Sequence, residues 1–536
     1  MRTIYTGGQV FTGALPLAEA FIVEDGCFLS VGTDAQILSL RQEGDAIVPL
    51  EGGFVCPGFN DSHMHLLNFG QSLNNARLDR HTGSLEDMLG CLRKFLETRI
   101  GSGWLMGRGW NQDYFSDVHR MPNRYDLDRV STQVPICAVR ACGHALCVNS
   151  KALEILGITA DTPQIDGGEI VMENGEPNGL LLDSAMDLVY DALAAPDLQA
   201  VKDMLRSACK ELNRVGITSC QSDDYCVFAE LPWQTVNQAL RELEEAVELT
   251  VRVYEQSNFT NLQDLTEFVE AGNVTGTGSD MFKIGPLKML GDGALGPRTA
   301  FLTVPYADAP ETKGLAVFSQ ETLDEMIGYA NRHGMQVAVH AIGDACTDRV
   351  LSAIEKALAD CPRQDHRHGI VHCQITRRDQ LEKMGQLKLH IYAQTVFLDY
   401  DSAIVEARVG KDLASTSYSW KTLMELGASV SNGTDCPVEA PPPLRGIQCA
   451  VTRQSISGEN PPYLPEQAFT VQEALDSYTA GSAYASFEEA VKGKIQTGML
   501  ADFVVLGEDP FTVAPDAIHT VPVLETYLAG TCVYRK

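Results

Sequence analysis

Two histidines separated by one residue, His63 and His65, stand in the segment PGFNDSHMH. Alternate side chains of an extended backbone point the same way, so this pair can present two imidazoles to one metal ion. Alone the pair is weak evidence, because histidines at this spacing also occur by chance in turns and on surfaces. Its meaning depends on which other side chains the fold brings to the same place.

Four further side chains of ligand or catalytic type stand near the ends of apolar, strand-like runs: His340 in MQVAVHAIGD, His372 in HGIVHCQ, Asp435 in ASVSNGTD and Lys288 in FKIGPLKMLGDG. Taken singly, the histidines could be hydrogen-bonded core residues, the aspartate a helix cap and the lysine a side chain with a buried stem. Taken together, they predict one shared site. Nitrogen and oxygen ligands of this kind suit Zn²⁺, with Fe²⁺ or Mn²⁺ as alternatives.

The elements that must position these side chains alternate strand-like runs with stretches of helical period. Eight strands are predicted, at 54–61, 216–224, 249–256, 282–293, 335–344, 368–374, 389–397 and 428–435. Eight parallel strands with intervening helices predict an α/β fold of the (β/α)8 TIM barrel type. Functional groups of such barrels lie at the C-terminal ends of the strands, where these candidates fall.

The two ends of the chain show short alternating runs broken by glycine, which are typical of hairpin strands. Residues 1–55 and 486–536 are therefore predicted to form one composite β-sandwich, with the barrel in 56–485. Residues from about 70 to 197 do not fit the strand–helix alternation. They predict an insertion after the first barrel strand, which we expect to cover the mouth of the barrel.

Charge and composition exclude several classes of function. The chain has 41 basic and 71 acidic residues, a net charge of −30, which repels phosphate backbones and anionic lipids. A small-molecule substrate is therefore expected, with neither nucleic acid nor membrane as partner, and a homodimer is compatible with the sequence. No apolar run is long enough for a signal peptide or a membrane span, so we expect a cytoplasmic protein. The 15 cysteines form no CxxC pair and are expected to be reduced.

Six segments occur in an order that resembles the metal-dependent amidohydrolase superfamily: PGFNDSHMH, PLKMLGDGALGPRTA, VAVHAIGD, GIVHC, NGTDCPVE and GMLADFVVL. The resemblance is strongest to the amidohydrolase-3 branch, which includes N-substituted formamide deformylase. It spans nearly the whole chain, including GRGWNQDYF and CGHALCVNSKAL in the insertion. It implies a hydrolase with one or two metal ions on a barrel beside a composite β-sandwich.

The resemblance also implies roles for the candidate residues. His63 and His65 would bind one metal, His340 and His372 the other, and Lys288 would bridge the two as a carbamate. This role agrees with electrostatics, because a cationic lysine would repel the metals whereas a carboxylated one supplies anionic oxygens. Asp435 would contact the metal and act as the catalytic base toward its water.

Substrate-binding residues are implied less specifically. Trp110, Asn111, Tyr114 and His144 lie in the insertion and could line the pocket, although its aromatic residues could equally pack a core of their own. Asp292, Arg298 and Gln394 are placed at the rim by strand position. Arg298 could bind a carboxylate or a developing oxyanion, or it could form an internal ion pair with Asp292. Thr395 and Asn111 depart from the residues common in the family, which puts the substrate of the relatives in doubt for this chain.

Three functions remain open on the sequence. The first is hydrolysis of an amide, N-formyl or N-acyl C–N bond of a small molecule by metal-activated water. The second is deamination of an amino-heterocycle at a single metal, and the third is an inactive assembly protein on the same fold. Inactive assembly proteins on this fold have usually lost metal ligands, whereas this chain retains every ligand type.

Overall fold

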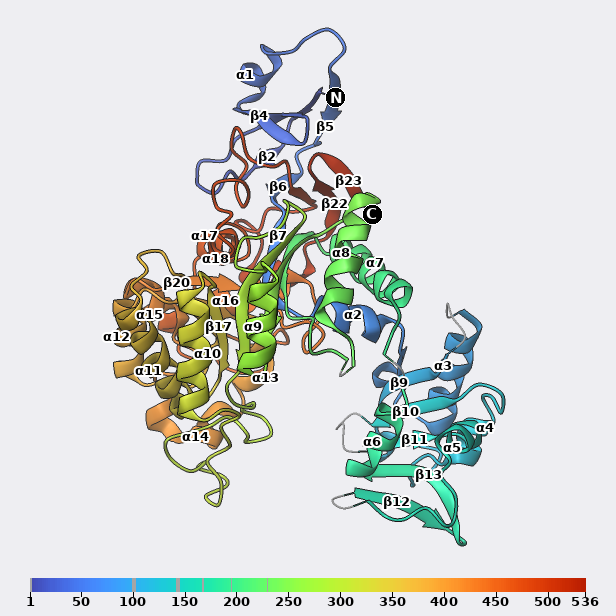
Figure 1. The fold of residues 1–536 in the computed structure, drawn as a ribbon. Helices are drawn as coiled ribbons and strands as arrows, with labels where there is room; N and C mark the ends of the chain where they lie inside the picture. The colour runs from blue at the N-terminus through green and yellow to red at the C-terminus, as the bar shows by residue number, and fades with distance from the viewer. Residues whose placement is uncertain (1, 99–102, 141–144, 166–167, 194, 229) are drawn as a thin grey trace. The chain divides into compact units, whose positions relative to one another are not determined.

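The structure, a computed structural model, describes residues 2–98, 103–140, 145–165, 168–193, 195–228 and 230–536. The chain forms two compact units (Figure 1). Unit 1 consists of Met1–Phe69 with Val201–Lys536, and unit 2 consists of Gly70–Ala200. The candidate ligands His63, His65, Lys288, His340, His372 and Asp435 all belong to unit 1.

The centre of unit 1 is the predicted TIM barrel, an eight-stranded sheet in the order β20-β19-β18-β17-β16-β15-β14-β7. Every ladder in this sheet is parallel. The strands are β7 (Phe59–Met64), β14 (Ile217–Ser222), β15 (Arg252–Asn258), β16 (Phe282–Leu290), β17 (Val337–Ala341), β18 (Gly369–His372), β19 (His390–Ala393) and β20 (Ser429–Asn432). They are almost entirely buried, as strands covered on both faces must be.

Helices follow the barrel strands and form an outer layer, in which α8 to α12 are plainly visible (Figure 1). In α7, buried Val201, Leu205, Ala208 and Leu212 recur at the spacing of one helix face, which explains why this segment packs on the sheet. The helices of unit 1 outside the β-sandwich are α2 (Leu66–Leu73), α7 (Leu198–Arg214), α8 (Trp233–Glu245), α9 (Leu262–Glu270), α10 (Gln320–Arg332), α11 (Asp344–Asp360), α12 (Arg378–Gln386), α13 (Leu398–Asp401), α14 (Val405–Ala414), α15 (Trp420–Glu425), α16 (Pro443–Thr452), α17 (Val471–Ser477) and α18 (Ala480–Ala485).

The first barrel strand differs from the sequence prediction. The segment 54–61 is not one strand: Phe54–Pro57 is β6 of the β-sandwich, and the barrel strand β7 begins at Phe59. The chain passes from one sheet to the other at Gly58, where a Cβ atom would lie 2.1 Å from the Thr218 hydroxyl. Only glycine tolerates this approach. The shift places His63 inside the strand and His65 one residue after it.

Both ends of the chain build the β-sandwich. One sheet has the order β4-β3-β1-β5 and the other β2-β6-β21-β22-β23, so strands from the two termini are hydrogen-bonded neighbours in the second sheet. Tyr5, Phe21, Phe503 and Tyr527 pack together in the core between them. The strands are β1 (Arg2–Thr6), β2 (Gln9–Val10), β3 (Ala20–Glu24), β4 (Cys27–Gly32), β5 (Ala46–Pro49), β6 (Phe54–Pro57), β21 (Phe503–Leu506), β22 (Val523–Leu528) and β23 (Thr531–Arg535), with helix α1 (Asp34–Leu38).

Unit 2 has a six-stranded mixed sheet of its own, in the order β12-β13-β11-β10-β9-β8. Unit 2 has two apolar core clusters, one around Trp110 and Leu127 and one around Val139 and Leu146. Its strands are β8 (Ala76–Arg77), β9 (Leu105–Trp110), β10 (Ile136–Arg140), β11 (Ala145–Val148), β12 (Gly168–Glu173) and β13 (Glu176–Asp183), and its helices are α3 (Leu85–Thr98), α4 (Arg124–Asp128), α5 (Ser150–Leu156) and α6 (Asp187–Tyr190).

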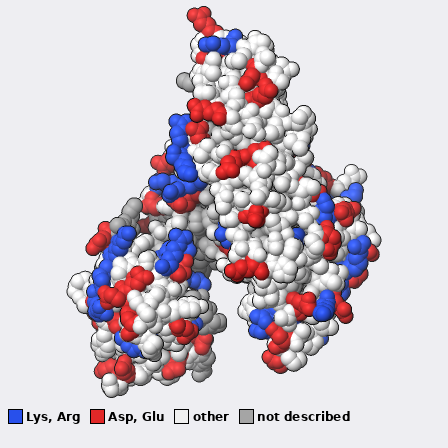
Figure 2. Space-filling view, turned by 180° about the vertical axis from the view of Figure 1, so that it is seen from behind, with Lys and Arg blue, Asp and Glu red and all other residues white. Residues whose placement is uncertain are grey.

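Charged side chains are spread over the surface. Carboxylates and basic groups are interspersed on the face seen in Figure 2, in a chain whose net charge is −30. Among the described residues, no helix combines the length and the apolar character that crossing a membrane requires.

Candidate metal centre

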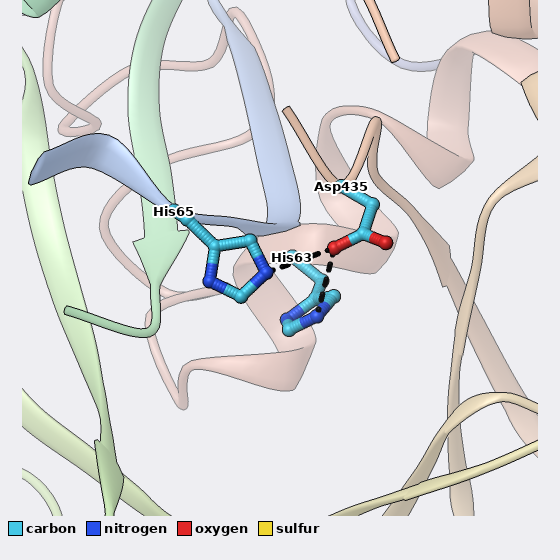
Figure 3. A group of neighbouring side chains, drawn as sticks. All are labelled: His63, His65 and Asp435. Atoms are coloured by element: carbon cyan, nitrogen blue, oxygen red, sulfur yellow. Dashed lines mark hydrogen bonds and ion pairs between the residues drawn. The ribbon is translucent and has the colours of Figure 1, made fainter. Parts of the chain in front are cut away.

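Three of the predicted ligands converge at one point (Figure 3). The Nε2 atoms of His65 and His63 lie 3.0 Å and 3.4 Å from the same carboxylate oxygen, Oδ1 of Asp435. One ligand atom from each of the three residues lies within 4.8 Å of the other two. Two imidazole nitrogens and a carboxylate oxygen at this separation form a donor set for a divalent cation.

The end of the barrel ladder places these three residues together. β7 and β20 are the two terminal strands of the sheet. Just beyond the end of β20, the Asp435 N–H donates to the His63 carbonyl oxygen at 2.8 Å, and the His65 N–H donates to the carbonyl oxygen of Cys436 at 2.8 Å. These main-chain bonds set the separation of the three candidate ligand side chains.

Asp61 strengthens the same junction from inside the barrel. Its carboxylate accepts hydrogen bonds from the main-chain N–H and the hydroxyl of Thr434, and from the main-chain N–H of His63. Asp61 is fully buried, and burial raises its pKa to about 7 although these hydrogen bonds favour the ionised form. Asp61 thus ties the strand that carries the histidine pair to the loop that carries Asp435.

Hydrogen-bond partners also fix the imidazoles. His63 Nδ1 lies 2.6 Å from Gln256 Oε1, and His65 Nδ1 lies 3.0 Å from the main-chain oxygen of Asp223. An oxygen acceptor on Nδ1 requires the proton there and leaves Nε2 with a lone pair for a metal. Both Nε2 atoms are the ones that face Asp435.

The other predicted pair, His340 and His372, adjoins the first. The ring centroids of His340 and His372 are 4.4 Å apart, and those of His63 and His372 are 5.6 Å apart. His372 Nδ1 lies 2.7 Å from Gln394 Oε1, which leaves Nε2 free to bind. His340 Nε2 lies 3.1 Å from the Gly293 carbonyl oxygen, which leaves Nδ1 as the nitrogen available to a metal.

Burial prepares the site for a cation. It lowers the pKa of both His63 and His372, and so favours the neutral imidazole that a metal requires. Burial also acts to lower the pKa of His65, but the hydrogen bond to Asp435 and the charges of Asp435 and Asp223 together outweigh it and raise that pKa to about 9. Asp435, in turn, has a pKa well below its ordinary value, because the two histidines outweigh the effect of burial. A divalent cation would replace the proton on His65 as the partner of this carboxylate.

Lys288 lies within the same barrel, on β16, and is fully buried. Its Nζ is 3.4 Å from Asp223 Oδ2, in an ion pair whose acceptor also receives a hydrogen bond from the Asn258 amide. Asp223 is the residue whose main-chain oxygen orients His65. Lys288 is therefore joined to the histidine cluster through Asp223.

Comparisons with known proteins agree with this geometry. Residues 46–534 match the amidohydrolase family, a stretch that contains every proposed ligand. The chain belongs to the amidohydrolase family. This membership makes the protein a hydrolase that depends on a divalent metal ion.

Individual amidohydrolase relatives are similar along the full chain. The protein YtcJ of Bacillus subtilis (strain 168) is 34% identical, with 100% of both chains aligned. N-substituted formamide deformylase of Arthrobacter pascens is 26% identical over 97% of this chain and 95% of its own. The crystal structure of a metal-dependent hydrolase from Pyrococcus furiosus superposes with a TM-score of 0.80 at 28% identity, covering 96% of this chain and 100% of the other.

Two of the three predicted substrate-binding residues of unit 1, Asp292 and Gln394, lie beside histidines of the site. Asp292 accepts hydrogen bonds from the main-chain N–H groups of Phe301, Ile342 and Gly343, and it lies 3.4 Å from His340. Gln394, as described above, orients His372. Gln394 therefore orients one histidine of the site, and Asp292 lies close to another.

Arg298 does not pair with Asp292, the partner that the sequence suggested. It forms a two-point ion pair with Asp308, which Arg408 also contacts. The reason is local: the loop after β16 folds back so that residues 298 and 308 meet, while main-chain donors occupy Asp292.

The predicted substrate residues of unit 2 are distributed differently. Trp110 is fully buried in an apolar core, with its indole N–H donated to the Ala138 carbonyl oxygen. Of the two alternatives for Trp110, pocket wall or core of the insertion, the structure has the core, because the whole side chain is enclosed by protein. Asn111 caps a short helical turn and accepts a hydrogen bond from Arg140, and Tyr114 is exposed. His144 lies outside the described residues.

Sequence reasoning missed Asp61, Gln256 and Asp223. Asp61 stands two residues before His63 in the same strand, and a period-two search for buried polar residues would have found it. Gln256 and Asp223 follow apolar runs at predicted strand ends, which is the same signal that singled out the ligands.

Proposed function

We propose that this protein uses metal-activated water to hydrolyse a C–N bond of the amide, N-formyl or N-acyl type in a small molecule. The observation that carries the proposal is the convergence of Asp435 with His63 and His65, beside the His340–His372 pair. One ring nitrogen of each histidine is engaged by an oxygen outside this group, which leaves the other nitrogen for a metal. The relationship to N-substituted formamide deformylase supports the bond type. The net charge of −30 disfavours a nucleic-acid substrate.

The residues fit Zn²⁺, in one or two ions per chain. His63, His65 and Asp435 would hold one ion, and His340 with His372 would hold the second. We further propose that Lys288 is carboxylated when both ions are present, because the buried cationic amine would otherwise repel them. Such ions would lower the pKa of a water molecule and polarise the scissile carbonyl.

Asp435 is the proposed base. One of its oxygens faces the two imidazoles, while the other points away from both rings (Figure 3). Its pKa is held well below the ordinary value by His63 and His65 against the effect of burial, so it is ionised at neutral pH and can accept a proton from the attacking water. After C–N cleavage, the same carboxyl returns the proton to the leaving nitrogen.

A combined assay tests the proposal. Purified protein is analysed for metal and then screened against N-formyl amines, N-acyl amines, cyclic amides and amino-heterocycles. Bound metal with hydrolysis in one of the first three groups supports the proposal. Release of ammonia from amino-heterocycles alone identifies a deaminase, and a metal-free, inactive protein would indicate an assembly role.

A further inference from the structure

His372 has an unusual backbone for the residue that ends a barrel strand. Its φ angle is +74°, and that of the next residue, Cys373, is +51°. Two consecutive non-glycine residues in the left-handed region are unfavourable without partners that hold them. The turn therefore needs support from neighbouring groups.

Trp420 contacts this turn directly. The residue begins α15, and its indole Nε1–H donates to the main-chain carbonyl oxygen of His372 at 3.1 Å. The donor is fully buried and the acceptor residue nearly so. A hydrogen bond enclosed in protein has no water to replace it, so its loss would release the carbonyl from its present orientation.

The tryptophan is itself rigidly packed. Its ring makes an edge contact with the Tyr418 ring, at a centroid distance of 5.5 Å and an interplanar angle of 89°. The Arg453 guanidinium lies 5.7 Å from the tryptophan ring and donates to the main-chain oxygen of Tyr418. A buried chain of contacts thus runs from Arg453 through Trp420 to the backbone of His372.

Other contacts set the ring of His372, whereas Trp420 bonds its carbonyl oxygen. Gln394 engages Nδ1, and the Phe397 ring stacks on the imidazole at an interplanar angle of 14°. On the other side of the turn, the Cys373 N–H donates to the Ala341 carbonyl oxygen at 3.2 Å. We propose that Trp420 is a positioning residue for the metal centre, which holds the left-handed turn at His372 and thereby directs the imidazole toward His340 and His63. This inference rests on the proposed role of His372 as a metal ligand.

The chain offers a matched control. Trp110 is also fully buried and also donates its indole N–H to a main-chain oxygen, that of Ala138 in unit 2. Trp420→Phe and Trp110→Phe therefore remove the same donor and the same volume from two cores. Only the first removes a bond to a proposed metal ligand.

The test measures Zn²⁺ affinity by competition with a chromophoric chelator, together with the stability of the metal-free proteins. We expect Trp420→Phe to weaken Zn²⁺ binding by about 10- to 100-fold, the usual effect of losing a partner that orients a metal ligand. Trp110→Phe should leave Zn²⁺ affinity within about twofold of the parent protein, although both variants lose stability. Equal Zn²⁺ affinity in the two variants would overturn the positioning role.

Two further variants keep the outcome decisive. If Trp420→Phe does not fold, β-(benzothiophen-3-yl)alanine at position 420 keeps the ring size and replaces only the N–H by sulfur, and the same loss of affinity is expected. His372→Ala separates the two hypotheses. If this variant binds Zn²⁺ as tightly as the parent, the proposed ligand set fails; if it loses Zn²⁺ while the residue 420 variants do not, only the inference about Trp420 fails.

Discussion

The main-chain N–H of Asp435 donates to the carbonyl oxygen of His63 at 2.8 Å. These residues are far apart in the sequence, yet this bond fixes the distance between the proposed base and the first histidine of the pair. The separation of the two residues is thus determined by the backbone at the barrel junction, and their side chains then meet with 3.4 Å between His63 Nε2 and Asp435 Oδ1.

Replacement of the base should separate metal binding from turnover. Asp435→Asn keeps an oxygen beside the histidines but cannot accept the proton of water. We expect most of the metal to be retained and kcat to fall by about a hundredfold or more, the scale of general acid–base catalysis. Metal analysis and steady-state kinetics on the same preparation measure both effects. Near-normal turnover would contradict the role of Asp435.

Lys288 should be required for the second metal. Lys288→Ala removes the group that could become a carbamate, so we expect a lower metal content as well as lower activity. Growth in ¹³C-labelled bicarbonate should add a carbamate carbon resonance to the metal-loaded parent and none to the variant. An unmodified Lys288 in a structure with both ions bound would rule out the bridging role.

Asp61 should support both folding and metal binding. Asp61→Ala leaves the buried Thr434 N–H and hydroxyl without their acceptor, at a cost of about 2 kcal/mol or more in the free energy of unfolding. Because the same contacts hold β7 beside the Asp435 loop, Zn²⁺ affinity should fall too. Urea unfolding of the metal-free protein and chelator competition measure the two losses. Full Zn²⁺ affinity in a destabilised variant would show that Asp61 serves the fold alone.

Glu488 should make the free energy of unfolding decrease at acid pH. The carboxylate lies 2.8 Å from Lys283 and 2.6 Å from Lys492. Burial acts to raise its pKa, but the two lysines outweigh burial and lower it from 4.5 to about 2. Because the pKa of Glu488 is lower in the folded state than in the unfolded state, the ionised carboxylate contributes its full stabilisation above about pH 4.5. This contribution is lost as the pH falls toward 2. Its size is about 3 kcal/mol.

Urea unfolding between pH 2 and 7 measures this contribution. Glu488→Gln should lower the free energy of unfolding at pH 7 by about 3 kcal/mol and flatten its decline between pH 5 and 2. Glu508→Gln, at an exposed position, is the control and should leave both unchanged. An identical pH profile for Glu488→Gln and the parent would contradict the assigned ion pairs.

Local sequence determined much of the barrel. Apolar runs that end in polar residues mark the seven later strands, and each run contains the strand seen in the structure or most of it, because burial on both faces imposes that pattern. The histidines and Asp435 could be selected for the same reason, since functional groups follow such runs. The boundary between β6 and β7 could not, because the chain changes sheets at Gly58 through a close approach to Thr218.

Contacts between distant segments were decided only by the tertiary structure. Trp110 was a candidate for either pocket or core in the sequence, and Trp420 was not singled out. Only the packing shows both enclosed and one of them bonded to His372. Arg298 has several acidic residues within reach along the chain, and loop folding selects Asp308. Residue type and period determine which side chains can do chemistry, whereas hydrogen bonds across the barrel determine which atoms are left free to do it.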